Sequence, residues 1–198
     1  MTNLYNFMDG ADGLAGGMAI FGFGACAAAA SIHGHAPIAM LSFCIVAAAA
    51  GFLLFNYPPA RIFMGDVGSV PLGFMAGAIG LTGWKEGIWP LIFPFIAFAP
   101  FIVDATVTLL RRALRKERVW QAHREHFYQR LVLSGWTHRR LAIAEYAMML
   151  VCSVSAVLLT LVPSVGVILI SLGVGLLLLG SMIMIDKRWR LFLRAHRA

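Results

Sequence analysis

The stretch GLAGGMAIFGFGACAAAASI, residues 13–32, decides the fold class because it runs for twenty residues without a single charged side chain. A helix of about 20 apolar residues is long enough to cross the hydrocarbon core of a bilayer. Five further stretches have a similar length and character: 37–55, 67–84, 88–110, 141–162 and 165–185. The sequence therefore predicts an all-α integral membrane protein whose residues 1–198 form one multi-span membrane domain with six transmembrane helices.

Composition and charge agree with this class. Apolar residues make up 60% of the chain and charged residues 13%, whereas soluble proteins average roughly 45–50% and 25%. Six spans divide the 16 Lys and Arg residues fifteen to one, with only Lys85 on the minority side. Because cytoplasmic loops of membrane proteins carry the excess of Lys and Arg, both termini are predicted to be cytoplasmic. The net charge of +7 therefore needs no nucleic acid partner to explain it.

Acidic residues occur at two places on the predicted cytoplasmic side: before the first span, and in the loop between the second and third spans. The turn before the first span carries Asp9 and Asp12, and the loop NYPPARIFMGDVGS, residues 56–69, carries Asp66 next to Gly65. Backbone amides of a glycine-containing loop entering a helix can bind an anion, and a neighbouring carboxylate can hold Mg²⁺ against it. The same residues also make an ordinary turn and helix cap. The pattern by itself leaves both interpretations open.

The segment 111–140 is basic and contains two histidines, His123 and His126, three residues apart. On a helix this spacing places both side chains on one face. With Arg124 and Arg130 they could bind a polyphosphate. Two other interpretations remain open: a weak metal pair, and a basic loop attracted to anionic lipid.

The span 88–110 contains three prolines, at 90, 94 and 100, and should be kinked. It ends near Asp104, an acidic residue that is costly inside a membrane unless it is paired or faces a wet cavity. Arg111 and Arg112 follow seven and eight residues later and lie on the same helix face. The sequence therefore favours an ion pair between Asp104 and these arginines.

Three segments occur in order along the chain: NLYNFMDGADGLAGG at 3–17, ARIFMGDVGSVPLGF at 60–74, and VDATVTLLRRALRKERVWQAHREHFYQRL at 103–131. Together they resemble the cytoplasmic motifs of the bacterial polyprenyl-phosphate N-acetylhexosamine-1-phosphate transferases, glycosyltransferase family 4. The third segment is more similar to the O-antigen and lipopolysaccharide branch than to the peptidoglycan branch.

The resemblance implies a reaction and a location. N-acetylhexosamine-1-phosphate is transferred from a UDP-N-acetylhexosamine to undecaprenyl phosphate, UMP is released, and synthesis of O-antigen or another cell-envelope polysaccharide begins. The implied cofactor is Mg²⁺, with Mn²⁺ as a substitute. The implied place is the bacterial inner membrane with the active face cytoplasmic, and membrane lipid and a homodimer are further expected partners.

The resemblance also implies roles for particular residues. Asp66 matches the family's magnesium ligand, and Asp9 lies close to the metal and phosphates. His126 matches a histidine motif that binds the pyrophosphate or sugar. These three residues are the predicted catalytic set, and Asp66 and Asp9 are the predicted metal ligands.

Five further residues match substrate-binding positions. Asn6 and Asp12 correspond to the nucleotide side of the first motif, with Asp12 facing the uracil edge. Phe63 corresponds to an aromatic residue that stacks on uracil. His123 and Arg124 belong to the predicted pyrophosphate- or sugar-binding segment.

The resemblance covers only the C-terminal part of the family. Other members carry further spans upstream and an adjacent aspartate pair, and this sequence contains no Asp-Asp dipeptide. The chain is therefore expected to be a truncated form that is inactive in isolation. An alternative is a catalytically inactive membrane protein that binds UDP-sugar or assembles with a complete enzyme. A transporter is disfavoured, because ionisable residues are absent from the middle of the spans.

Overall fold

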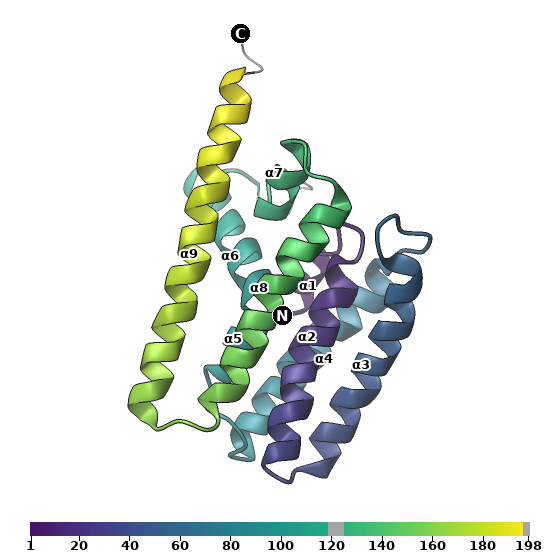
Figure 1. Cartoon of the computed structure of the whole chain (residues 1–198), viewed down its shortest axis with the longest axis vertical. Helices are drawn as coiled ribbons and strands as arrows, with labels where there is room; N and C mark the ends of the chain where they lie inside the picture. The colour runs from purple at the N-terminus through teal and green to yellow at the C-terminus, as the bar shows by residue number, and fades with distance from the viewer. Residues whose placement is uncertain (119–124, 196–198) are drawn as a thin grey trace.

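The computed structural model describes residues 1–118 and 125–195. Helices account for all the regular secondary structure in these two ranges, which contain no strand, and this confirms the all-α prediction (Figure 1). The helices are α1 (Thr2–Phe7), α2 (Leu14–Ile32), α3 (Ala36–Asn56), α4 (Gly65–Lys85), α5 (Phe93–Ala97), α6 (Ala99–Leu114), α7 (Phe127–Leu133), α8 (His138–Leu159) and α9 (Ser164–Ala195).

Five of the described helices, α2, α3, α4, α8 and α9, are long and apolar enough to cross a membrane. The kink expected in the predicted sixth span, 88–110, is a full break, because this segment forms a turn followed by α5 and α6, with Phe98 between the two helices. Pro94 and Pro100 each occupy the first turn of one of these helices. Proline fits there because it has no N–H to donate, whereas inside a helix it removes a hydrogen bond and clashes with the preceding turn.

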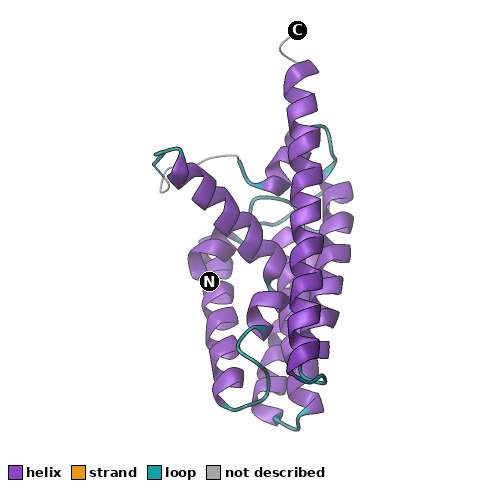
Figure 2. Ribbon diagram, turned by 90° about the vertical axis from the view of Figure 1, so that its left-hand side faces the viewer, coloured by secondary structure: helices purple, strands orange, loops and turns teal. Residues whose placement is uncertain are grey.

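The connections between the long helices gather at two ends of the bundle (Figure 1). Residues 33–35, 86–92 and 160–163 lie at the lower end of this view, and the loops 57–64 and 134–137 lie at the upper end. The α5–α6 segment still carries the chain from the lower end towards the upper end. Figure 2 shows that α6 leans away from the long axis of the bundle as it does so. Lys85, at the last residue of α4, belongs to the lower end.

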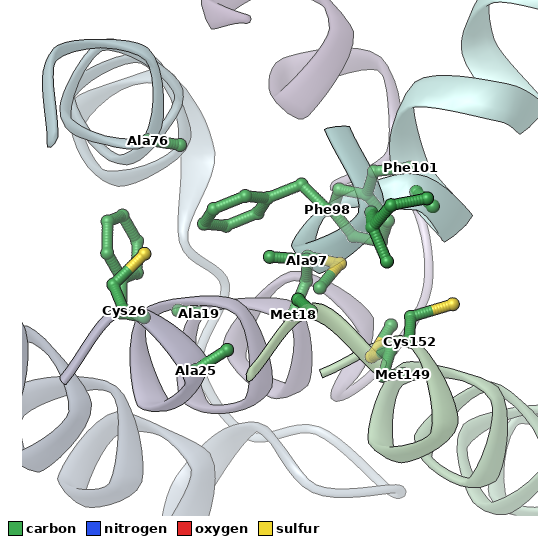
Figure 3. Packing of buried hydrophobic residues seen from close by; sticks show 14 of the residues in the cluster. Met18, Ala19, Ala25, Cys26, Ala76, Ala97, Phe98, Phe101, Met149 and Cys152 are labelled. Carbon is green, nitrogen blue, oxygen red and sulfur yellow. The ribbon is translucent and has the colours of Figure 1, made fainter. Parts of the chain in front are cut away.

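Helix α2 lies at the centre of the packing, against α3, α8, α4 and α5. Most of its residues are buried, and many are Gly or Ala, which allows neighbouring helices to approach closely. Figure 3 shows the side chain of Met18 on α2 near Phe98, which lies between α5 and α6, and near Met149 on α8. An ideal Cβ at Gly22 would lie 2.3 Å from Cε1 of Phe98. The glycine-rich face is therefore a packing surface, as the sequence predicts.

We expect Gly22→Ala to destabilise the bundle, since the added methyl group overlaps the buried Phe98 ring. Overpacking of this kind costs roughly 1–3 kcal/mol, and each kcal/mol lowers Tm by about 2–4 °C in a protein of this size. Gly24→Ala is the matched control, because nothing lies within 4 Å of a Cβ at Gly24. Thermal unfolding in detergent measures both variants, and equal losses of stability would contradict this packing.

Candidate active site

The acidic turn after α1 is held against the loop that precedes α4. Asp9 Oδ2 accepts a hydrogen bond from the backbone N–H of Gly65 at 3.1 Å, and Asp12 Oδ2 accepts one from the N–H of Ala60 at 3.1 Å. These contacts join residues 56 and 48 positions apart in the sequence. They place Asp9 beside the first turn of α4, which carries Asp66. The Gly65 amide, predicted from the sequence to face an anion, is thus bonded to a carboxylate of the protein.

Helix α1 is fixed on the surface of α4 by a polar contact and a close backbone approach. The Ser69 hydroxyl donates to Asn6 Oδ1 at 2.6 Å. An ideal Cβ at Gly73 would lie 2.6 Å from the Cα of Thr2. Glycine at this position therefore allows α1 to lie directly on α4, and Asn6 is brought to the same region as Asp9.

Asn56, which sequence reasoning missed, fixes the start of α2. It is buried, its Oδ1 accepts from the N–H of Gly13 at 2.9 Å, and its Nδ2 donates to the carbonyl of Ile62 at 2.8 Å. Tyr146 donates from its hydroxyl to the Gly13 carbonyl at 2.8 Å. Gly13 adopts φ 76°, a backbone conformation that favours glycine. The sequence signal for Asn56 is an amide side chain directly after an apolar span.

His138 is a second residue that sequence reasoning missed. Its Nδ1 lies 3.2 Å from Asp12 Oδ1 and 3.3 Å from the Asp12 backbone nitrogen. Protonated Nδ1 pairs with the carboxylate, whereas neutral Nδ1 can accept from the amide. In both states His138, the first residue of α8, contacts Asp12. Asp12 is therefore held by Ala60 from the loop before α4 and by His138 from α8. No local pattern around His138 identifies this contact.

The carboxylates of Asp9 and Asp66 interact electrostatically. Burial raises the pKa of Asp9 to about 6; the hydrogen bond from Gly65 opposes this rise and the nearby Asp66 carboxylate adds to it. Mg²⁺ is usually bound by one or two protein carboxylates together with substrate phosphates. Asp9 and Asp66 fit such a partial site, and the described residues contain no cluster of three or more His, Cys, Asp or Glu that could hold a metal.

Asp104 anchors the start of α7. Its Oδ1 accepts from the backbone N–H of Phe127 at 3.0 Å and lies 3.1 Å from Nδ1 of His126, and its Oδ2 accepts from the N–H of Tyr128 at 3.1 Å. Asp104 is buried, and so is His126, which is only 2% exposed. A carboxylate at a helix N-terminus satisfies amides that have no partner within the helix. Asp104 therefore positions His126 directly.

Two expectations about this region are corrected. Arg111 pairs with Asp186 at 2.8 Å and Arg112 with Glu117 at 2.9 Å. The site is therefore not organised by the expected ion pair between Asp104 and these arginines. His126 does not lie within a helix, because it is the N-cap residue of α7. The physical reason is the same for both: Asp104 binds a segment more than 20 residues later in the chain.

Contacts between α1 and α7 bring His126 towards the acidic turn. The rings of Phe7 and His126 stack with their centroids 6.3 Å apart, and the Tyr128 hydroxyl donates to the Phe7 carbonyl at 3.3 Å. An ideal Cβ at Gly10 would lie 2.1 Å from that hydroxyl. The first and third sequence motifs therefore meet at the residues on either side of Asp9.

The predicted site residues are thus largely gathered at one end of the bundle. Asn6, Asp9 and Asp12 contact the second motif, and His126 contacts the first. Asp66 is exposed in the first turn of α4, and Phe63 is 77% exposed in the preceding loop. The remaining two, His123 and Arg124, lie outside the described residues.

Comparison with known proteins adds an independent observation. Residues 1–84 match the family described as Glycosyl transferase family 4. The chain is 34% identical over 161 residues to a probable undecaprenyl-phosphate N-acetylglucosaminyl 1-phosphate transferase of Bacillus subtilis, which covers 80% of this chain and 45% of the relative. It is 31% identical over 160 residues to a phospho-N-acetylmuramoyl-pentapeptide-transferase of Listeria welshimeri, covering 79% and 47%. The chain spans about half the length of these curated relatives.

Proposed function

Because this chain belongs to glycosyl transferase family 4, among the polyprenyl-phosphate hexosamine-1-phosphate transferases, we propose that it carries the nucleotide- and metal-binding face of such an enzyme. The proposed reaction transfers N-acetylhexosamine-1-phosphate from a UDP-sugar to undecaprenyl phosphate and releases UMP. The observation that carries this proposal is the meeting of three distant motifs, through the Asp9–Gly65 and Tyr128–Phe7 hydrogen bonds.

The chemistry suits these residue types. Joining two phosphates brings several negative charges together, so a phosphoryl-transfer site works mainly by positioning and charge neutralisation. Asp66 and Asp9 would hold Mg²⁺, or Mn²⁺ in its place, and the ion would neutralise charge on the pyrophosphate. His126, held by Asp104, would orient the pyrophosphate or the sugar.

The nucleotide would bind between the first and second motifs. Phe63 is exposed and can stack on uracil. Each oxygen of the Asp12 carboxylate already has one polar neighbour, but a carboxylate has about four acceptor positions in all. Asp12 can therefore accept a further hydrogen bond from the uracil edge while Ala60 and His138 keep it in place.

Phe63→Ala is expected to weaken binding of the UDP-sugar without unfolding the protein, because the exposed ring supports no core packing. Base stacking on an aromatic side chain contributes roughly 1–3 kcal/mol, which corresponds to about 5- to 150-fold in Kd. Isothermal titration calorimetry measures this loss. Ile62→Ala, in the same loop, is the control that should bind normally. An unchanged Kd for Phe63→Ala would show that uracil does not stack on this loop.

We also propose that the site faces the cytoplasm in a bacterial inner membrane, as the distribution of Lys and Arg favours. Single cysteines at His33→Cys and Arg61→Cys, in a background lacking Cys26, Cys44 and Cys152, test this orientation. Both positions are exposed and lie at opposite ends of the bundle. An impermeant thiol reagent added outside spheroplasts should label His33→Cys and spare Arg61→Cys. The reverse result would place the site outside.

A further inference from the structure

A cavity of about 340 Å³ lies between α6, α7, α8 and α9. This volume falls within the range of roughly 300–1,000 Å³ that is typical of ligand pockets. The side chains that line it are mainly apolar, and its polar lining includes Asp104 and Glu145 from the interior and Arg188 from α9. The apolar part of the wall includes Val103, Phe127, Met148, Met182 and Ile185.

Trp136 lines this cavity and also a second, shallower hollow that includes Arg139 and Arg140. The guanidinium carbon of Arg140 lies 4.3 Å from the centre of the Trp136 ring, and that of Arg188 lies 5.8 Å from it. Arg188 also donates to the Ser134 hydroxyl and carbonyl, at 3.0 and 3.1 Å, which fixes its position. We call Trp136, Arg139, Arg140 and Arg188 the Trp136 cluster.

The charge of the Trp136 cluster is not balanced by acids. Nearby arginines of α6 and α7 are paired with an acid: Arg111 and Arg130 both bind Asp186, at 2.8 and 2.7 Å. In contrast, the three arginines of the cluster have no carboxylate within ion-pair distance among the described residues. The buried indole N–H of Trp136 also lacks an acceptor there. The cluster therefore presents positive charge and a spare donor to a ligand that is an anion and an acceptor.

The position of the Trp136 cluster relative to the long helices indicates the chemical class of that anion. Arg139 and Arg140 lie in the first turn of α8, directly before its apolar residues, and Arg188 follows the apolar part of α9. At 1.5 Å per residue, the cavity residues Met148 and Met182 lie roughly two turns further into the apolar region. Arginine and tryptophan at a membrane boundary, above an apolar cavity, match the headgroup and acyl chain of a lipid.

We propose that the Trp136 cluster and the adjoining cavity bind one anionic phospholipid of the bilayer, with its phosphate between Arg140 and Arg188 and one acyl chain in the cavity. Asp104 and Glu145 in the cavity wall repel an anion from the interior. The lipid phosphate therefore stays at the arginines, and the acyl chain enters the cavity. A soluble anion would leave the apolar wall unfilled. This inference is independent of the proposed function.

Lipid titration followed by native mass spectrometry tests the inference on the purified, delipidated chain. Phosphatidylglycerol should bind, and phosphatidylcholine with the same acyl chains should bind at least tenfold more weakly. The double variant Arg140→Gln/Arg188→Gln should lose about 30-fold in phosphatidylglycerol affinity. Arg190→Gln/Arg194→Gln removes the same charge from exposed positions of α9 and should bind normally. Equal losses in both double variants would overturn the inference.

A second variant tests the acyl-chain position. Ala144 lines both hollows, so Ala144→Phe should fill the entrance and reduce the affinity for long-chain phosphatidylglycerol to that of a six-carbon-chain analogue. Melting temperatures near that of the unmodified chain show that each variant is folded. Unchanged long-chain binding by Ala144→Phe would contradict the proposed chain position. Undecaprenyl phosphate is measured in the same assay. If it binds more tightly than phosphatidylglycerol and depends equally on the arginines, the site belongs to the polyprenyl lipid and the assignment to a phospholipid is overturned.

Discussion

Asp66→Asn should lower the rate of UMP release on the order of 100-fold or more, in membranes where this chain is co-expressed with the N-terminal half of a relative, while the helices remain folded. Asp66 is exposed in the first turn of α4, so its carboxylate is not part of the packed interior. Its loss therefore removes the proposed metal ligand without removing packing. Losing one member of a catalytic unit costs orders of magnitude in turnover, and added Mg²⁺ should recover little of the rate.

Glu86→Gln is the matched control for this substitution, because Glu86 is an exposed acid at the opposite end of the same helix. Its rate of UMP release should equal that of the unmodified protein. A rate near normal for Asp66→Asn, measured with saturating UDP-sugar, would mean that the metal is bound elsewhere.

Asp104→Ala should release the start of α7 from the bundle. The substitution leaves the amides of Phe127 and Tyr128 and the ring of His126 without their buried acceptor. Each buried group left unsatisfied costs roughly 1–3 kcal/mol, so the three together amount to at least about 3 kcal/mol, or more than 100-fold in a local opening equilibrium. Amide hydrogen exchange at Phe127 and Tyr128 should accelerate accordingly, and UMP release should fall with it.

Thr108→Val separates this effect from a general loss of packing around Asp104. The Thr108 hydroxyl donates to Asp104 Oδ1 at 3.1 Å, so the variant removes one hydrogen bond and keeps the carboxylate. Exchange at Phe127 and Tyr128 should then change much less than in Asp104→Ala, because the Asp104 carboxylate still accepts hydrogen bonds from both amides. Protection that survives in Asp104→Ala would show that α7 is held by other contacts.

The sequence predicts the class of fold and the general position of the site well, for a physical reason. Apolar length determines which segments can enter a membrane, and polar residues that interrupt such segments are forced to their ends. The acidic turn around Asp9, the loop around Asp66 and the segment around His126 were therefore predicted to lie at one end of the bundle, where the structure places them.

Other features depend on contacts that no local pattern contains. Pro90, Pro94 and Pro100 indicate a disturbed helix, but whether the helix bends or breaks depends on how neighbouring elements satisfy the freed carbonyls. The helical spacing of Asp104 and Arg111 identifies a common face, but the actual partners of Asp104 come from α7. His138 reaches Asp12 across 126 residues, so only the tertiary structure reveals it.

The most direct test of the account is the transfer itself. Membranes in which this chain is co-expressed with the N-terminal half of a relative would be incubated with undecaprenyl phosphate, Mg²⁺ and UDP-N-acetylglucosamine or UDP-N-acetylgalactosamine labelled in the sugar. The account predicts that label enters the lipid fraction together with an equal amount of UMP, and that both products require the polyprenyl phosphate. Binding of the UDP-sugar with no labelled lipid, or UMP release that is independent of the lipid acceptor, would contradict it.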